Sequence, residues 1–399
     1  MIKKILILLL FSVQCFGAAR FWVGGHPTNN NWNQTGSGTT NWSATSGGAG
    51  GASVPGASDD VTFDGAGGGN STATISATIT VLSFTVTGGY TSTITHNAVL
   101  TVAGNVTLNT SYTIAGSSAM TISAASTLTG NGKAWANNMT WTGSNTKTIS
   151  GNFTVSGTLT ISGTTTLNQT GTDTLILSGI TNNSTTSGTA RIKLVGGTWS
   201  GASKLSNNLD IAGNITISGS VVYQTGTLKY ISGTVTTTSS TLTITGTTTL
   251  NTNGINFNNI TFSSSSPTIT LGSLLTATGT VRVNNAIGVT YSGSFGFSYN
   301  TLIYDNASAN TQTFVNGVTY TITNSLQGYQ SRMVSILALT SDHATNKAII
   351  TLNQGATCNL LANLTRIDAS GGRTIRTFNG TITSCTNVQE FHDLQTIGF

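Results

Sequence analysis

A nine-residue phrase recurs four times in the chain and limits the possible folds more than any other feature. Its copies read LTVAGNVTL, FTVSGTLTI, LDIAGNITI and LTATGTVRV, and they begin at Leu100, Phe153, Leu209 and Leu275. Positions one, three, seven and nine are nearly always apolar, while positions two and eight are polar. Alternation at period two is typical of a strand with one buried face and one wet face.

Glycine occupies position five of every copy, as Gly104, Gly157, Gly213 and Gly279. Each glycine lies between two pairs of apolar residues, on the register that we expect to be buried. We interpret it as a corner, where the chain bends inward and a side chain would collide, or where φ must be positive. The phrase therefore predicts a strand, a corner and a second strand.

One such unit cannot bury its apolar row alone, whereas stacked units can. The copies start 53, 56 and 66 residues apart, so we expect coils with loops of different lengths. Asn105 and Asn214 follow two of the corner glycines, where an asparagine can bond backbone groups of its own turn or of the next coil. We predict an all-β chain folded as a parallel β-solenoid over residues 66–325. A β-sandwich or several small β domains are the alternatives.

Charged residues are scarce, at 6% of the chain against roughly 25% in an ordinary soluble domain. The formal net charge is +5, and two of these charges, Lys3 and Lys4, lie in a segment that we expect to be removed. The other basic residues are scattered along the sequence. Nucleic-acid binding needs clustered cations, so we do not expect a nucleic-acid partner.

Residues 1–17 combine a positive start, a short apolar run and small residues ahead of Ala18. This pattern predicts a bacterial signal peptide that is cleaved between Gly17 and Ala18. Lipidation at Cys15 is the alternative. The apolar run is too short to span a bilayer comfortably. We therefore expect a secreted or cell-surface protein, bacterial or phage-encoded, without a membrane span after the signal is removed.

Residues 18–65 form a predicted N-terminal cap, in which Trp22, Trp32 and Trp42 are spaced ten apart. A solenoid end exposes strand edges and an apolar cross-section, which buried tryptophans would cover. An aromatic platform that contacts glycans is the alternative.

Asp59, Asp60 and Asp64 are the carboxylate cluster of this predicted cap. Calcium takes several oxygen ligands, usually from a bent loop, so these residues form a candidate calcium site. The alternative is a turn in which the carboxylates accept hydrogen bonds from backbone N–H groups. We expect no other cofactor.

The start Phe21-Trp-Val-Gly-Gly25, the segment Asn41-Trp-Ser43 and the segment Asp59-Asp-Val-Thr-Phe-Asp64 resemble the opening of secreted β-helical passenger and adhesin proteins, including autotransporter-associated β-strand proteins. The resemblance covers the cap and, loosely, the repeats to about residue 325. It implies a right-handed parallel β-helix and exposure at the cell surface. An autotransporter would also carry a C-terminal membrane barrel, which we do not expect in the residues after Ser325.

Residues 326–399 form a predicted C-terminal β cap. Cys358 and Cys385 are the only cysteines after the signal. An exported protein with two cysteines most simply makes one disulfide. Such a bond would stabilise the cap by roughly 3–4 kcal/mol in the chain-entropy model. Two free thiols or an intermolecular bridge are the alternatives.

Sugar-cleaving enzymes generally rely on paired carboxylates held close together. Four aspartates outside the cap are far apart in sequence: Asp173, Asp210, Asp305 and Asp342. The four histidines have no metal-ligand spacing. We therefore do not expect an enzyme.

Together these patterns predict an exported structural or adhesive surface protein, with a subunit of an extracellular filament as one form of it. Solenoid ends expose strand edges, so self-association from head to tail is expected, and the Thr- and Asn-rich faces can bind surface glycans. An ice-binding protein, suggested by Thr158, Thr160, Thr241 and Thr243, is one alternative. A polysaccharide-degrading β-helix, such as a phage tailspike, is the other.

Overall fold

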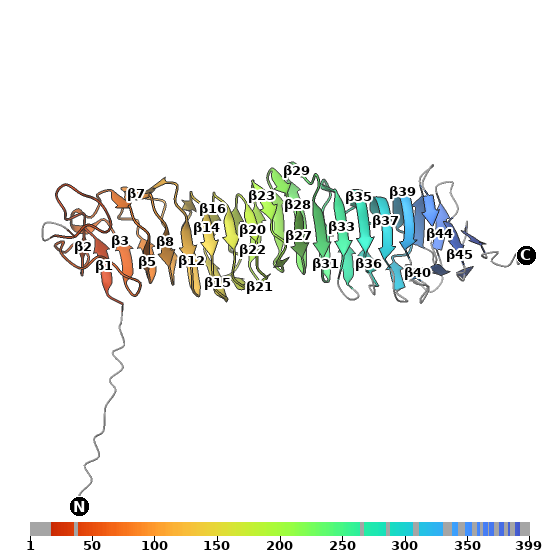
Figure 1. Ribbon diagram of the computed structural model, residues 1–399, viewed down its shortest axis with the longest axis horizontal. Coiled ribbons are helices and arrows are strands. Elements are labelled where there is room, and N and C mark those ends of the chain that lie inside the picture. Colours follow the sequence, from red (N-terminus) through yellow and green to blue (C-terminus); the bar gives the residue numbers. More distant parts are fainter. Residues whose placement is uncertain are drawn as a thin grey trace, which may run out of the picture. The chain divides into compact units, whose positions relative to one another are not determined.

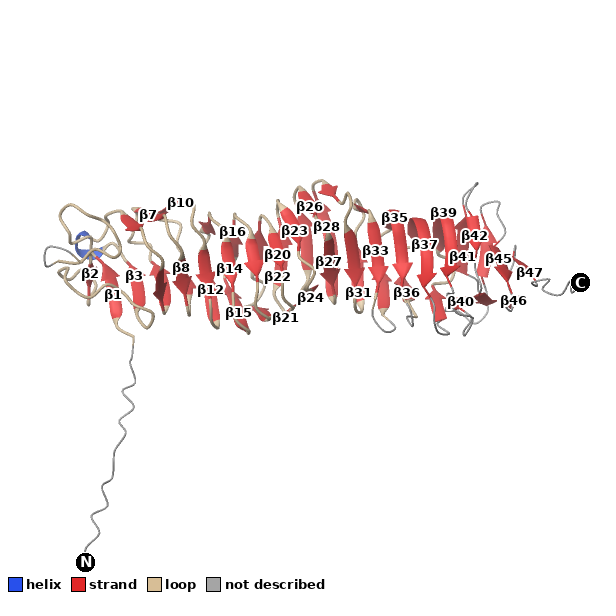
Figure 2. Ribbon diagram, in the orientation of Figure 1, coloured by secondary structure: helices blue, strands red, loops and turns tan. Residues whose placement is uncertain are grey.

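The computed structural model describes residues 17–35, 39–263, 267–284, 288–305 and 311–329, and then the strands between Leu337 and Phe391. Side chains are described as far as residue 327 and at residues 349 and 350. Within this part, every regular element except the short 3-10 turn η2 (Ala66–Gly68) is a β-strand (Figure 2). The chain divides into an N-terminal unit, up to Ser123, and a C-terminal unit, from Ala124. Each unit is a parallel β-solenoid, so the predicted fold class is confirmed, while its right-handedness stays a prediction.

The N-terminal unit has three faces, which the chain visits in turn. Face I stacks β1 (Ala19–Trp22), β3 (Asp60–Phe63), β6 (Ser83–Val86) and β9 (Val106–Thr107) in parallel, with β2 (Trp42–Ser43) antiparallel on the outer edge of β1. Face II stacks β4 (Ala73–Ile75), β7 (Thr93–His96) and β10 (Thr113–Gly116). Face III stacks β5 (Ile79–Val81), β8 (Leu100–Val102) and β11 (Met120–Ile122). The predicted boundary between cap and solenoid at residues 65 and 66 therefore falls inside this unit.

The C-terminal unit begins with three faces and continues with two long ones. Its strands follow one another in sequence along the unit (Figure 1). Face IV comprises β12 (Ser126–Thr129), β15 (Asn145–Ser150), β18 (Thr165–Gln169) and β21 (Thr186–Ser187). Face V comprises β13 (Ala134–Trp135), β16 (Phe153–Val155), β19 (Thr174–Leu177), β22 (Arg191–Leu194), β25 (Leu209–Ala212), β28 (Gly226–Ser232), β31 (Thr248–Asn251), β34 (Thr268–Leu271), β36 (Thr290–Gly293), β38 (Thr311–Phe314), β40 (Leu337–Ser341), β43 (Ala362–Thr365) and β46 (Ile382–Thr383).

Face VI comprises β14 (Met139–Trp141), β17 (Leu159–Ile161), β20 (Ile180–Asn182), β23 (Thr198–Ser200), β26 (Ile215–Ile217) and β29 (Val235–Thr236). Face VII comprises β24 (Lys204–Leu205), β27 (Ser220–Tyr223), β30 (Thr241–Ile244), β33 (Asn259–Phe262), β35 (Leu275–Val283), β37 (Phe297–Asp305), β39 (Thr319–Tyr329), β41 (Ala348–Leu352) and β44 (Ile367–Ser370). Two short strands join its edge, β32 (Asn256–Phe257) on β35 and β42 (Thr357–Asn359) on β39, and β45 (Ile375–Phe378) pairs with β47 (Val388–Phe391).

The expected alternation of buried and solvent-facing residues is present along the strands. In β8, Leu100 and Val102 are buried in the interior while Thr101 points outward. Where both partners lie between Asp60 and Tyr329, residues paired on neighbouring coils are 17 to 24 positions apart, so one coil is much shorter than the spacing of the repeated phrase. Each coil therefore contributes an apolar side chain or two per strand, and stacking joins them into a continuous core.

The repeated phrase does not mark successive coils. Its second and third copies occupy the same position on face V three coils apart, since Phe153 stacks on Leu175, Leu175 on Ile192, and Ile192 on Leu209. The first copy lies at a corner of the N-terminal unit and the fourth lies inside β35 on face VII. The first three copies thus turn a corner between two faces, whereas the fourth forms one continuous strand.

The corner glycines are explained by close approach between coils. None of Gly104, Gly157, Gly213 and Gly279 has a positive φ. A Cβ at Gly213 would lie 1.9 Å from the carbonyl oxygen of Val195 in the preceding coil, and one at Gly157 would lie 2.5 Å from the backbone of Asn137. The predicted corner is present at Gly104, Gly157 and Gly213, which lie between two strands, and close approach of the neighbouring coil explains the glycine; at Gly279 the predicted corner is wrong, because β35 is continuous there. The predicted buried register is wrong, because these partly exposed glycines face the neighbouring coil. Gly279 lies at a register shift inside a continuous strand.

Asparagine side chains connect the corners of successive coils. The Oδ1 atom of Asn214 accepts a hydrogen bond of 2.9 Å from the backbone N–H of Thr234, in the next coil, which is one of the two contacts expected from the sequence. The same contact recurs at four more corners: Asn138 to Thr158, Asn152 to Thr174, Asn208 to Thr227 and Asn259 to Thr280. Each one satisfies a backbone donor that the strand ladder leaves without a partner at the corner.

Aromatic residues fill the interior where the C-terminal unit becomes two-sided. Face VI ends at β29, and the strands of face VII then lengthen to 9 residues in β35 and 11 in β39. Between the long faces, Tyr291 stacks on Phe314 at 5.4 Å and Phe297 stacks on Tyr299 at 3.9 Å. Burial raises the pKa of Tyr291 well above its ordinary value, so its hydroxyl stays neutral.

Candidate functional site

The three tryptophans of the predicted cap form a buried cluster. Trp22, Trp32 and Trp42 each have an exposed fraction of 0%. Trp42 lies 4.4 Å from Trp32 and 5.2 Å from Trp22 between ring centroids, both edge to face, and its Nε1 donates to the carbonyl oxygen of Trp32. Phe63 of β3 stacks on Trp22 at 5.6 Å. The cluster is cap core, and the exposed ring face that stacking on a sugar requires is missing at all three residues.

The three cap aspartates point to different partners. Asp59 accepts hydrogen bonds from the N–H groups of Ala18 and Gly56, each at 2.9 Å. Asp60 accepts from the hydroxyl of Ser83, and Asp64 accepts from the N–H of Ala66 at 3.0 Å. Among the described residues, no group of three or more His, Cys, Asp or Glu is placed to hold a metal. The geometry matches the turn-and-cap interpretation of these residues and gives the calcium prediction no support.

The described residues do not test the predicted disulfide between Cys358 and Cys385. Cys358 lies in β42, but its side chain and the whole of Cys385 lie outside the described residues. The bond stays a prediction.

The described aspartates outside the cap each have a specific partner. Asp173 accepts a hydrogen bond of 2.7 Å from the N–H of Gly151. Asp210 pairs with Arg191, and Asp305 pairs with Arg282. Asp342, Asp368 and Asp393 lie outside the residues whose side chains are described.

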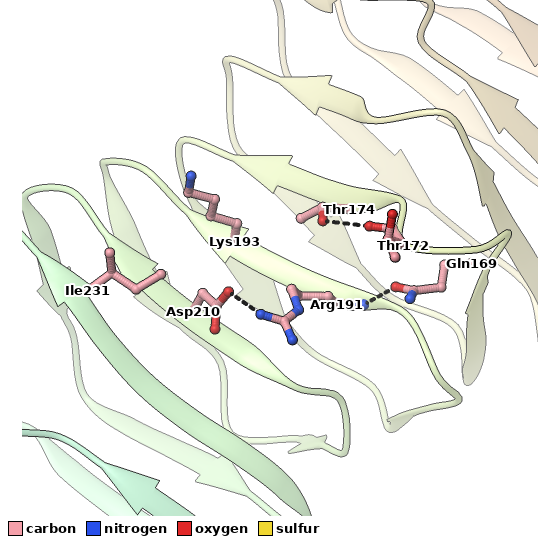
Figure 3. A pocket seen from close by; sticks show the side chains of 7 residues that line it. All are labelled: Gln169, Thr172, Thr174, Arg191, Lys193, Asp210 and Ile231. Carbon is pink, nitrogen blue, oxygen red and sulfur yellow. Dashed lines mark hydrogen bonds and ion pairs between the residues drawn. The ribbon is translucent and has the colours of Figure 1, made fainter. Parts of the chain in front are cut away.

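Face V carries a groove of about 370 Å³ that the sequence did not point to. It extends across β19, β22, β25 and β28, with Ile231 at one end and Gln169 at the other (Figure 3). Its lining residues are Gln169, Thr172, Thr174, Arg191, Lys193, Asp210 and Ile231. The volume is in the usual range for sites that bind small molecules, roughly 300–1,000 Å³.

An ion pair is part of the groove lining. Nη1 of Arg191 donates to Oδ2 of Asp210 at 2.9 Å, and the exposed fractions of the two side chains are 49% and 8%. A buried carboxylate needs such a partner, because leaving it unpaired in the protein interior is costly. Gln169 Oε1 accepts from the backbone N–H of Arg191 at 2.7 Å, which fixes the start of β22.

Stacking brings further cations beside this pair. Lys193 is the register partner of Asp210 on one side, and Lys229 is its register partner on the other. The region thus has three cations and one carboxylate, in a chain with 6% charged residues. Low-dielectric walls and one dominant sign of charge concentrate the local field, so this surface favours an anionic ligand.

A register shift in β28 forms the apolar end of the groove. The pairing of β25 with β28 is regular through Tyr230 and then shifts between Ile211 and Ala212. Ile231 is left 47% exposed at the rim. The groove therefore combines cations, the polar side chains of Gln169, Thr172 and Thr174, and one apolar wall.

The sequence interpretation of the basic residues as scattered is wrong for this face. Lys193, Asp210 and Lys229 are separated by 17 and 19 positions, which is one coil each, so they stack on adjacent strands. A search for charges at the coil length would have found the column. The phrase spacing of more than fifty residues concealed that length.

Threonine columns are the second notable surface feature. On face VI, Thr140, Thr160, Thr181 and Ser200 stack in register, and the hydroxyls of the last two lie 3.1 Å apart. Each of these three-residue strands has one outward residue between two buried ones, so each coil contributes one hydroxyl and the hydroxyls form a single column. Thr241 and Thr243 lie on β30 of face VII, away from Thr160.

Comparison of the chain with protein-family models, with curated proteins and with solved structures finds no match. No helix in the described ranges has the length and the apolar character needed to cross a bilayer.

Proposed function

We propose that the protein is an exported adhesive β-solenoid of the bacterial surface, and that the face V groove binds glycans that carry carboxylates. The observation that supports this most is the column of Lys193, Asp210 and Lys229, with Arg191 beside it. Asp210 neutralises one cation, which leaves a net positive surface for an acidic sugar.

The other lining groups match the rest of a sugar ring. Gln169, Thr172 and Thr174 offer hydrogen-bonding side chains, and Ile231 offers an apolar surface for ring C–H groups. A carboxylate suits the arginine in particular, because the planar guanidinium can donate two parallel hydrogen bonds. This chemistry favours uronic acids and similar acidic sugars over neutral ones.

A filament subunit that grows through its N-terminal strand edges is less well supported than an adhesin. On face I, β2 covers the outer edge of β1 with Trp22 opposite Trp42. On face II, the segment at Asn31 bridges to Thr74, and the N–H of Trp32 donates to the carbonyl oxygen of Thr74 at 2.7 Å. On these two faces the covered edges prevent pairing with another copy. Self-association through other surfaces stays a prediction.

The two remaining alternatives are weaker for physical reasons. Ice binding through hydroxyl ladders calls for a regular two-dimensional array, whereas the threonines of face VI form a single column and the outward pair Thr241 and Thr243 lies on a different face, VII. Cleavage of a polysaccharide by paired carboxylates needs two acidic groups in one site. The groove is lined by one, Asp210, which is held in an ion pair.

The test is a titration of the mature protein with trigalacturonate and with a neutral galactose trisaccharide. We expect binding of the acidic sugar only. Lys193→Ala leaves the Arg191–Asp210 pair in place and should weaken binding about tenfold, since a hydrogen bond to a charged group is worth roughly 1.5 kcal/mol. Lys229→Ala removes a cation that lies beside the groove without lining it, and it should weaken binding by less.

Lys204→Ala is the matched control, because Lys204 is an exposed lysine of the same unit on face VII. It should leave the affinity unchanged. Equal binding of the two trisaccharides, or an equal loss in the Lys204 variant, would contradict the proposed site.

A further inference from the structure

The backbone nitrogen of Ala18 is held by a carboxylate. Its N–H donates to Oδ1 of Asp59 at 2.9 Å, across 41 residues of sequence. The other oxygen of Asp59 accepts from the N–H of Gly56 at 2.9 Å, so the side chain is fixed from both sides. A charged amine in the place of this amide would make a much stronger hydrogen bond with the carboxylate.

The backbone of Gly17, the residue before Ala18, lies very close to the backbone of Ser58. A Cβ on Gly17 would lie 1.5 Å from the carbonyl oxygen of Ser58, so no residue with a side chain fits there without a backbone shift. Immediately after this point the chain enters β1, where Ala19 pairs with Asp60. The N–H of Asp60 also donates to the carbonyl oxygen of Ala18 at 3.1 Å. Ala18 is therefore the first residue that is firmly attached to face I.

We propose that the chain is cleaved between Gly17 and Ala18, and that the new α-ammonium group of Ala18 binds the carboxylate of Asp59 and locks β1 in place. An endopeptidase of the export route supplies the catalyst. Water adds across the peptide bond, which releases the leader with the carboxylate of Gly17 and leaves the amine on Ala18. The amine takes up a proton and can then donate three hydrogen bonds instead of one.

The proposed ion pair between Ala18 and Asp59 is independent of glycan binding, because it lies in the N-terminal unit and uses none of the groove residues. Its charged neighbours are few. Asp60 is occupied by the hydroxyl of Ser83, and Arg20 donates to the carbonyl oxygen of Ala19 at 2.9 Å and to the hydroxyl of Ser53 at 2.7 Å. Asp59 is thus the carboxylate whose oxygen is aimed at the Ala18 nitrogen.

The first experiment is the intact mass of protein secreted by a bacterial host. We expect the mass of residues 18–399. A chain that begins at any other residue, including one lipidated at Cys15, would overturn the proposal. A Gly17→Ala precursor should yield the same mature mass, because alanine is also small enough for cleavage and is then removed.

The second experiment is a double-mutant cycle on purified protein. One form begins at Ala18 with a free amine, the other has the same amine acetylated, and each is made in the parent sequence and with Asp59→Asn. We expect acetylation to lower the melting temperature of the N-terminal unit by roughly 2–4 °C in the parent sequence and to change it little in the Asp59→Asn variant. An equal effect of acetylation in both backgrounds would overturn the ion pair, even if the cleavage site is correct.

Discussion

Replacing Gly213 with alanine would place a methyl group 1.9 Å from the carbonyl oxygen of Val195 and 2.3 Å from its carbonyl carbon. Both atoms are backbone, so no flexible side chain can yield. The two coils would have to separate by more than about 1 Å to restore an ordinary contact. That movement strains the bonds that attach this region to its neighbours, such as Val195 N–H to Leu177 and Thr216 N–H to Gly197, each 2.9 Å long.

The expected cost is about 2–4 kcal/mol. Forced overpacking alone costs roughly 1–3 kcal/mol, and each weakened hydrogen bond adds roughly 0.5–1.5 kcal/mol. Because neighbouring coils of a solenoid can open locally, hydrogen exchange read by mass spectrometry is a better assay than a single melting temperature. Peptides that cover β25 and β26 should lose protection by at least tenfold.

Two glycines of the same unit provide controls. Gly196→Ala meets nothing within 4 Å and has no positive φ, so it should be within about 0.5 kcal/mol of the parent. Gly219→Ala also meets nothing but has a φ of +66°, so it should cost roughly 1–2 kcal/mol from backbone strain alone. If the Gly213 variant loses no more protection than the Gly196 variant, close packing between coils is not the reason for the corner glycines.

Three further predictions concern the N-terminal unit and the corners. Burial lowers the pKa of His96 to about 4, so below pH 6.5 the unfolded chain binds a proton that the folded chain excludes. The free energy of unfolding should therefore fall by roughly 3 kcal/mol between pH 6.5 and pH 4. A His96→Gln variant with the same pH dependence would contradict this. Trp42→Ala removes the centre of the tryptophan cluster and should cost about 3–5 kcal/mol in chemical denaturation, so a loss under 1 kcal/mol would show that the cluster is not cap core. Asn214→Ala removes the acceptor of the Thr234 N–H and should lower the local stability by about 1 kcal/mol. The Thr234 amide should then exchange roughly fivefold faster, and unchanged exchange would show that Asn214 does not stabilise the contact between coils.

Strand alternation and corners could be predicted from the sequence because both are local. Period-two burial needs only neighbouring residues, and β8 follows it residue by residue. The glycine in the phrase likewise signals a special backbone position. Which special property it serves could not be predicted, since the collision at Gly213 comes from Val195 in another coil.

The coil length could not be predicted, and this explains the missed groove. The phrase returns at Phe153 and Leu209 after three coils, so its spacing conceals the true repeat. Register across coils decides which outward residues meet, and a column such as Lys193, Asp210 and Lys229 becomes apparent only when that register is known. For the tryptophans, the local sequence was compatible with both a buried cluster and an exposed platform. Only the packing around Trp42 distinguishes these two possibilities.

Glycan binding in this groove is tested most directly by a crystal structure of the mature protein soaked with trigalacturonate. We expect the sugar in the face V groove, with a carboxylate within hydrogen-bond distance of Arg191 or Lys193 and with the Arg191–Asp210 pair intact. An empty groove at saturating sugar, or a sugar bound only elsewhere on the chain, would contradict the assignment of this groove as the glycan site.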